Sequence, residues 1–258
     1  MPTIEIARLW YPASDPVHGF DHVLRVYHLA ERLAQIEGAD LEIVCAAALL
    51  HDIESGEWGV ESGRGKVDSG QWTVGSESAS QRPVSATADP GTVSEFANEQ
   101  INNQQPAINN QRMTHHLSSA EFAAQVLRAE GWPDERIAAV QHCIRAHRFR
   151  DRQEPPATLE AQVLFDADKL DAIGAIGVAR AIGFAVQAGQ PAYASPSAQF
   201  LETGELQPGE PHSAYHEYLF KLRKIKERML TASGRKLAEE RHQVMAEFFE
   251  RLAQEMGG

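Results

Sequence analysis

The sequence predicts an all-α fold, and three observations support this prediction. Apolar residues recur at helical spacing along almost the whole chain outside one segment, residues 54–114. Strand-like alternation of apolar and polar residues is nearly absent. Residues that favour helix starts and stops stand at the ends of the periodic stretches. With 258 residues, 43% of them hydrophobic and 23% charged, the chain can form one large or two small globular domains.

Two helices are expected before residue 54. Asp15 and Pro16 can open the first, which directs its apolar residues toward a core and stops at Gly38. Asp40 is the expected N-cap of the second, which reads LEIVCAAALLHD. Because this second segment is apolar almost all the way round, we expect it to lie at the centre of the fold.

Further helices are expected after residue 114. Ser118 or Ser119 should cap a helix that ends at Gly131. Pro133 occupies a first-turn position of the next helix. Thr158 then opens a long and strongly apolar stretch.

The last hundred residues are helical by pattern as well. Gly174 and Gly177 indicate that the apolar stretch forms either two helices or one long kinked helix. Ser213 is expected to start a long amphipathic helix. A final helix should run from about Arg235 to the C-terminus.

Residues 54–114 interrupt this pattern. They are rich in Ser, Gly, Gln and Asn, with single apolar residues scattered without a period. Such a composition buries too little surface to offset the entropy of ordering, so we expect a disordered or poorly ordered insertion within a single domain, residues 1–258. We expect the insertion to loop out over the site mouth or into solvent, so that its deletion leaves the fold intact.

Charge and cysteine content narrow the function classes. The net charge of -12 argues against a nucleic acid polymer as partner, because phosphate backbones are bound by clustered Lys and Arg. The sequence shows no secretory signal pattern and no apolar run of about 18 residues. Only Cys45 and Cys143 are available for a disulfide. These features predict a cytoplasmic protein without membrane contact, and they leave the oligomeric state open, a homodimer included.

Histidines gather in two places that can bind a ligand. His51 and Asp52 end the apolar helix, and both can reach one ion only near that helix end. A terminal histidine favoured by the helix dipole is the ordinary explanation of this pair taken alone. His18, His22 and Arg25 share one inward face of the first helix. Two imidazoles and an arginine without acids on that face need a partner such as a metal or an anion.

Aspartates gather in a third place, the DADKLD segment of the apolar stretch. Burying three unpaired aspartates would be costly. Asp168 and Asp171 are three positions apart and share a face, whereas Asp166 points elsewhere. Helix capping, or ion pairs with Lys169 or Arg180, is the structural alternative to cation binding.

Two imidazoles and two carboxylates form a mixed nitrogen and oxygen donor set. Such a set suits a borderline-to-hard divalent metal ion, with Mn²⁺ the leading choice and Fe²⁺, Mg²⁺ or Co²⁺ as alternatives. An ion of this kind polarises a phosphoryl oxygen and lowers the pKa of a coordinated water. The sequence offers no Ser-His-Asp elbow, Walker loop or GxGxxG motif in support of another chemistry.

These motifs resemble those of the HD-domain metal-dependent phosphohydrolase superfamily. HxxRV at 22–26, HD at 51–52 and the later Asp of DADKLDAIGAIG match its H…HD…D pattern. The chain looks most like a smaller bacterial branch that is nucleotide pyrophosphohydrolase-like, through six segments in the same order: HGFDHVLRV, AAALLHDI, HHLSSAEFAAQVL, IRAHRF, DADKLDAIGAIGVARA and LRKIKERMLTASGRKLAEERHQVMAEFFERL. The resemblance covers nearly all of the chain except residues 54–114. It implies an HD-domain helical bundle with a long low-complexity insertion.

The resemblance implies His22, His51, Asp52 and Asp168 as metal ligands. Asp168 is preferred to Asp166 because the superfamily's last Asp usually follows a small residue and precedes a basic or small one, as in the Ala-Asp-Lys sequence here.

The resemblance also implies catalytic and substrate-binding residues. Asp52, His116 and His147 are the candidates for catalysis. The two histidines fall where related branches bind a second metal or a substrate phosphate, with structural or surface histidines as the alternative. The candidates for substrate binding are His18, Arg25, His142, Arg148 and Lys221. His142 is the weaker of the histidines by spacing, and Lys221 can equally belong to a solvated charged face.

The implied reaction is hydrolysis of a phosphate ester or anhydride in a small nucleotide through a metal-activated water. A nucleoside triphosphate would yield the monophosphate and pyrophosphate. The alternatives are a nucleotidase that releases orthophosphate and a non-catalytic metal or nucleotide sensor. A purely structural helical bundle would leave the three aspartates of DADKLD without a physical explanation.

Overall fold

A computed structural model describes residues 1–11, 19–53, 116–148 and 154–257. These residues form helices joined by turns, with no strand in the described part of the chain, which confirms the all-α prediction. They belong to one compact unit, Met1–Glu54 with His115–Gly258. The predicted insertion lies outside the described residues.

The described helices are joined mostly by short turns. A helix over residues 116–129 precedes α5. In chain order the others are α1 (Ile4–Arg8), α2 (Phe20–Glu37), α3 (Leu41–Leu50), α5 (Asp134–Ala146), α6 (Leu159–Leu170), α7 (Gly174–Gln187), α8 (Ala198–Thr203), α9 (Ala214–Phe220), the 3-10 helix η1 (Leu222–Arg228) and α10 (Ala232–Glu255).

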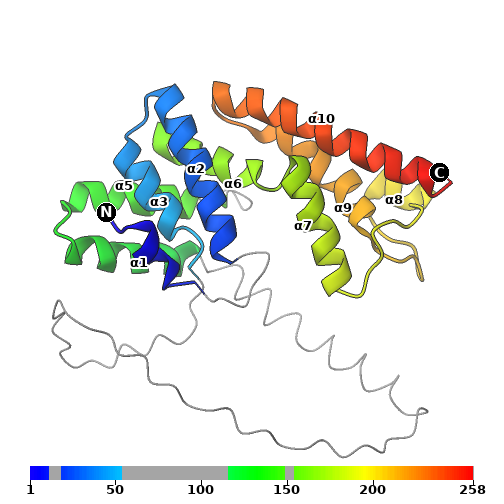
Figure 1. The fold of residues 1–258 in the computed structure, drawn as a ribbon, viewed down its shortest axis with the longest axis horizontal. Helices are drawn as coiled ribbons and strands as arrows, with labels where there is room; N and C mark the ends of the chain where they lie inside the picture. The colour runs from blue at the N-terminus through cyan, green and yellow to red at the C-terminus, as the bar shows by residue number, and fades with distance from the viewer. Residues whose placement is uncertain (12–18, 54–115, 149–153, 258) are drawn as a thin grey trace, which may run out of the picture. The chain divides into compact units, whose positions relative to one another are not determined.

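The apolar helix α3 lies at the centre of the N-terminal half, as predicted. Its eight residues from Ile43 to Leu50 are all buried. α2, α5 and α6 pack around it, and α1 contacts it as well (Figure 1). Burying a leucine such as Leu49 completely contributes about 1.5–3 kcal/mol to stability. The end of α3 is therefore held firmly inside the bundle.

Asp40 fixes where α3 begins. Its side chain accepts hydrogen bonds from the backbone N–H groups of Glu42 and Ile43, which is the N-cap arrangement expected from the sequence. Arg136 of α5 donates to both carboxylate oxygens of Asp40 at 2.9 and 3.1 Å. The cap therefore also ties α3 to α5.

The C-terminal half packs along the long helix α10. α10 contacts α7, η1, α6 and α2, and it buries Met245 and Phe249 completely. α6 and α7 meet at a bend of 60°. At this bend Gly174 has φ 78°, and a Cβ there would lie 3.1 Å from the Arg241 side chain. Of the two predicted arrangements, the structure has two helices.

No single helix in the described ranges has the length and apolar character needed to cross a membrane. The bent pair α6 and α7 passes the test of length and composition when taken together.

Two predicted helix starts differ from the structure in the first half of the chain. α2 begins at Phe20 after an extended Gly19, not at Asp15 and Pro16, which lie outside the described residues. Ser118 and Ser119 lie inside helix 116–129. The Ser119 hydroxyl is buried and donates to the Ile53 carbonyl instead of capping.

Other predicted helix ends are close to the structure or need correction. Thr158 caps α6 as predicted, and Pro133 is the residue before the first turn of α5. Ser213 does cap a helix, but α9 ends after seven residues. At Lys221 the backbone leaves the α-helical region, and η1 follows. The last helix starts at Ala232 rather than about Arg235.

Candidate metal centre

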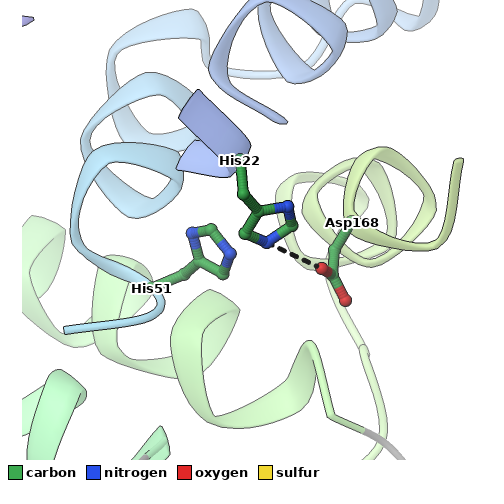
Figure 2. A group of neighbouring side chains, drawn as sticks. All are labelled: His22, His51 and Asp168. Atoms are coloured by element: carbon green, nitrogen blue, oxygen red, sulfur yellow. Dashed lines mark ion pairs between the residues drawn. The ribbon is translucent and has the colours of Figure 1, made fainter. Parts of the chain in front are cut away.

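Three of the four predicted ligands lie together where α2, α3 and α6 meet. Among the described residues, one donor atom each of His22, His51 and Asp168 lie within 4.8 Å of one another. His22 is in α2, His51 follows the last turn of α3, and Asp168 is in α6. Figure 2 shows the two imidazoles and the carboxylate converging, with His22 Nε2 3.5 Å from Asp168 Oδ1. Both histidines are buried.

A buried carboxylate orients the His22 ring. His22 Nδ1 lies 2.7 Å from Asp171 Oδ2, so Nδ1 carries the proton and donates. When the ring is neutral, this leaves Nε2, which faces Asp168, as the nitrogen that can bind a metal. A carboxylate behind a ligating imidazole fixes its tautomer and raises its basicity. Asp171 itself is fully buried and also accepts from Arg25 and Arg180.

Local backbone fixes the tautomer of two further histidines. His51 and His147 follow the last turns of α3 and α5, and each Nδ1 donates to the carbonyl three residues earlier, of Ala48 and Ile144. Both imidazoles therefore present a lone pair at Nε2. The two rings meet edge to face, with centroids 5.1 Å apart.

His51 Nε2 is the clearest sign that the cluster fits a cation. It is buried and has no hydrogen-bond partner among the described residues, a costly state for a polar atom. Burial lowers the pKa of His51 and outweighs the nearby Asp52 and Asp168 carboxylates. Burial also holds the pKa of His147 well below its ordinary value. Both rings are thus neutral at pH 7, as metal ligation requires.

Asp168 is charged and shared between two partners. Burial alone would raise the pKa of Asp168, but the neighbouring Lys169 ammonium holds it well below its ordinary value. One oxygen, Oδ1, faces His22, and the other accepts from Lys169 Nζ at 2.6 Å. The sequence pattern predicts Lys169 only as an ion-pair partner of the aspartates. The two imidazole nitrogens and this carboxylate form a donor set suited to Mn²⁺ or Fe²⁺.

Asp52 is not part of the 4.8 Å donor group. It follows His51 directly and is half-buried. Its role as a fourth ligand therefore stays a prediction.

The two other histidines with predicted catalytic roles differ in position. His147 lies against His51, at the edge of the donor group. His116 is half-buried in helix 116–129. Neither belongs to the donor group, and their roles stay predictions.

The predicted substrate-binding residues are spread over several environments. Arg25 donates to Asp171 through Nε at 2.7 Å and through Nη2 at 3.1 Å. The His142 ring is engaged on both sides, by Glu154 at 2.8 Å and by the Ala157 N–H. Lys221 forms an ion pair with Glu217 and is half exposed, which agrees with the alternative of a solvated charged face. Arg148 is half-buried after His147, and His18 lies outside the described residues.

The three aspartates of DADKLD have three separate tasks. Asp168 joins the donor group, and Asp171 holds His22, Arg25 and Arg180. Asp166 is buried and accepts from the backbone N–H groups of Leu230 and Thr231, at the start of α10. The ion pair between Arg180 and an aspartate, which was the structural alternative, is thus present and is formed by Asp171. The sequence did not reveal that Asp171 supports a ligand, because the contact crosses from α6 to α2.

Comparison with known proteins agrees with this geometry. The family model described as HD domain matches residues 19–67 and 92–173, just over half of the chain. Its gap lies inside the predicted insertion. The uncharacterized protein YpgQ of Bacillus subtilis (strain 168) is 30% identical over 244 residues, covering 93% of this chain and 85% of YpgQ.

Solved structures of similar fold were found as well. The crystal structure of Bacillus subtilis YpgQ in complex with ADP is 26% identical, covers 99% of both chains and has a TM-score of 0.59. An HD-superfamily hydrolase from Bacillus thuringiensis is 21% identical, covers 99% of this chain and 97% of its own, and has a TM-score of 0.58. The chain belongs to the HD domain family.

Proposed function

We propose that this protein is a metal-dependent phosphohydrolase that acts on a nucleotide, with a divalent cation held by His22, His51, Asp52 and Asp168. The observation that carries the proposal is His51 Nε2, a buried nitrogen with no partner among the described residues. It lies beside a second imidazole and a charged carboxylate whose donor atoms are within 4.8 Å. A cation satisfies all three groups at once.

The residues around the donor group prepare it for this task. A divalent cation supplies Lewis acidity, which polarises a phosphoryl oxygen and activates water. Asp171 holds His22 in the tautomer that offers Nε2, and the Ala48 carbonyl does the same for His51. Because these partners are buried, the donors need little rearrangement to bind an ion.

A nucleotide is the proposed substrate. The structure of the relative YpgQ in complex with ADP supports this choice. The proposed reaction on a nucleoside triphosphate yields the monophosphate and pyrophosphate. His116 and His147 are proposed near the reacting phosphate, with Arg25, Arg148, Lys221, His18 and His142 as further candidates for substrate contact. A cytoplasmic location belongs to this proposal.

The test measures phosphate and pyrophosphate release from a panel of nucleotides with added Mn²⁺. Wild type is compared with Asp52→Ala and with a control, Asp134→Ala, whose carboxylate is 93% exposed at the start of α5. Pyrophosphate released by wild type and the control but not by Asp52→Ala would support the proposal.

Other results would change the proposed function. Orthophosphate from monophosphates would indicate a nucleotidase. A protein that binds Mn²⁺ but releases nothing would be a sensor. A protein that binds no Mn²⁺, by metal analysis after dialysis, would contradict the metal site itself.

A further inference from the structure

We propose that Lys169 binds a phosphoryl oxygen of the substrate when a cation occupies the donor group. The inference rests on the proposed function, because it concerns the anion that the metal site takes. It adds a substrate-binding residue that the spacing of the histidines and arginines did not indicate.

The two oxygens of Asp168 face different positive groups. Oδ1 lies 3.5 Å from His22 Nε2, on the side of the three donors. Oδ2 accepts a hydrogen bond from Lys169 Nζ at 2.6 Å. A cation in the donor group and the Lys169 ammonium therefore flank one carboxylate. An anion with several oxygens, such as a phosphate, can contact both positive groups together.

Lys169 is held in place by several contacts. Its ammonium also donates to the His147 carbonyl at 3.1 Å and lies 4.9 Å from the centroid of the Phe165 ring. The side chain is 12% exposed, so it is mostly but not completely buried. A lysine ammonium is a compact charge with three donors, of which these contacts use two.

Two arginines beside the donor group bind another partner. Arg25 and Arg180 both donate to Asp171, on the far side of the His22 ring from Asp168. Lys169 donates directly to Asp168, a member of the donor group. It is therefore better placed than these arginines to bind an anion beside the ion.

Metal binding changes what Lys169 can gain from an anion. A cation on Asp168 takes up part of the negative charge that now compensates the ammonium group. Lys169 and the ion then repel each other, and an anion between them removes this repulsion. Metal binding and phosphate binding should therefore strengthen each other. If Lys169 served only to neutralise Asp168, its removal would leave the phosphate affinity of the manganese-loaded protein unchanged.

The experiment measures binding rather than turnover. Equilibrium dialysis gives the affinity for Mn²⁺, and then the affinity of the manganese-loaded protein for inorganic phosphate. Lys169→Met removes the charge and keeps the length, whereas Lys169→Arg keeps a charge. The control is Lys226→Met, which removes a partly exposed lysine paired with Glu239 on α10.

In Lys169→Met we expect unchanged or tighter Mn²⁺ binding and phosphate affinity about tenfold to hundredfold weaker, the worth of a charge-assisted hydrogen bond. Lys169→Arg should keep most of the affinity, and Lys226→Met all of it. The loss of one such bond should weaken phosphate binding at least about tenfold. A phosphate affinity of Lys169→Met within about twofold of the wild-type affinity would therefore overturn the inference. Weaker Mn²⁺ binding, or no phosphate binding by manganese-loaded wild type, would overturn it too. Nucleotide hydrolysis measured in parallel separates the two proposals. If the protein hydrolyses nucleotides but Lys169→Met binds phosphate normally, the proposed function stands and this inference fails.

Discussion

Replacing Asp171 by Asn should weaken metal binding although Asp171 is not one of the proposed metal ligands. Its carboxylate is 1% exposed and accepts from His22 Nδ1 at 2.7 Å, from Arg25 Nε at 2.7 Å and from Arg180 Nη1 at 2.6 Å. An amide has one accepting oxygen for these donors and adds an NH₂ group that faces them. The His22 ring then loses the partner that fixes its tautomer and its orientation.

Two magnitudes follow from these contacts. Removing one partner of a buried ion pair costs about 3–5 kcal/mol of stability. Arg25 and Arg180 are 33% and 18% exposed, so water screens them and the lower end of this range is expected. Loss of the carboxylate behind a ligating histidine weakens metal affinity about tenfold to hundredfold, which is about 1.4–2.7 kcal/mol.

A second buried aspartate on the same helix provides the control. Asp166 is likewise buried, but it accepts hydrogen bonds from the backbone N–H groups of Leu230 and Thr231 and from the Thr231 hydroxyl, away from the donor group. Asp166→Asn should therefore lower the melting temperature and leave Mn²⁺ affinity unchanged. The measurement is Mn²⁺ affinity by titration calorimetry at a temperature where both variants remain folded. Equal Mn²⁺ affinity in wild type and Asp171→Asn would refute the reasoning, as would an equal loss in both variants.

Two further predictions concern the stability of the fold. Gly234→Ala places a methyl group against the Asp166 carboxylate and should lower the free energy of unfolding by about 1–3 kcal/mol through overpacking. A methyl group at Gly183 meets no atom within 4 Å, so Gly183→Ala should stabilise α7 by up to about 1 kcal/mol. Chemical denaturation measures both variants, and a less stable Gly183→Ala than Gly234→Ala would contradict this prediction. Glu210 lies in the segment before α9, where burial would raise its pKa but N–H and hydroxyl donors from Gln207 and Ser197 lower it to about 2. Because the folded pKa lies below the unfolded value of 4.5, the stabilisation is complete above about pH 4.5 and is lost as the pH falls toward 2. Glu210→Gln should therefore melt lower than wild type at pH 7, with the difference shrinking in acid; a constant difference in melting temperature across this range would argue against the assignment.

The sequence predicted those parts of the site that depend on helix spacing. His22, His51 and Asp168 each stand on an apolar helix face, and burying these faces together brings the three side chains to one point. Helix ends were predictable where one residue decides them, as with the Asp40 cap and the left-handed Gly38. Such signals act within a few residues of the chain.

The remaining features depend on contacts between distant segments. The partners of Asp166 and Asp171 could not be predicted, because they lie at the start of α10 and on α2 and α7. The helices α1 and α8 have five and six residues, too few for a periodic pattern. The predicted long helix after Ser213 breaks at Lys221, whose backbone is not α-helical, and the 3-10 helix η1 follows with Leu222 and Ile225 buried.

The placement of the three donors has a consequence for how long the protein survives in a cell extract. His22 lies in α2, His51 directly follows α3 and Asp168 lies in α6, so a bound ion would cross-link two consecutive helices to a third that lies far along the chain. The unfolded chain has no such arrangement, so the ion binds the folded state alone. A free metal concentration one hundred times the dissociation constant would add about 2.7 kcal/mol to the free energy of unfolding. Chelation should then raise the rate at which a protease cuts these core helices, well before any change in the helical content of the intact protein.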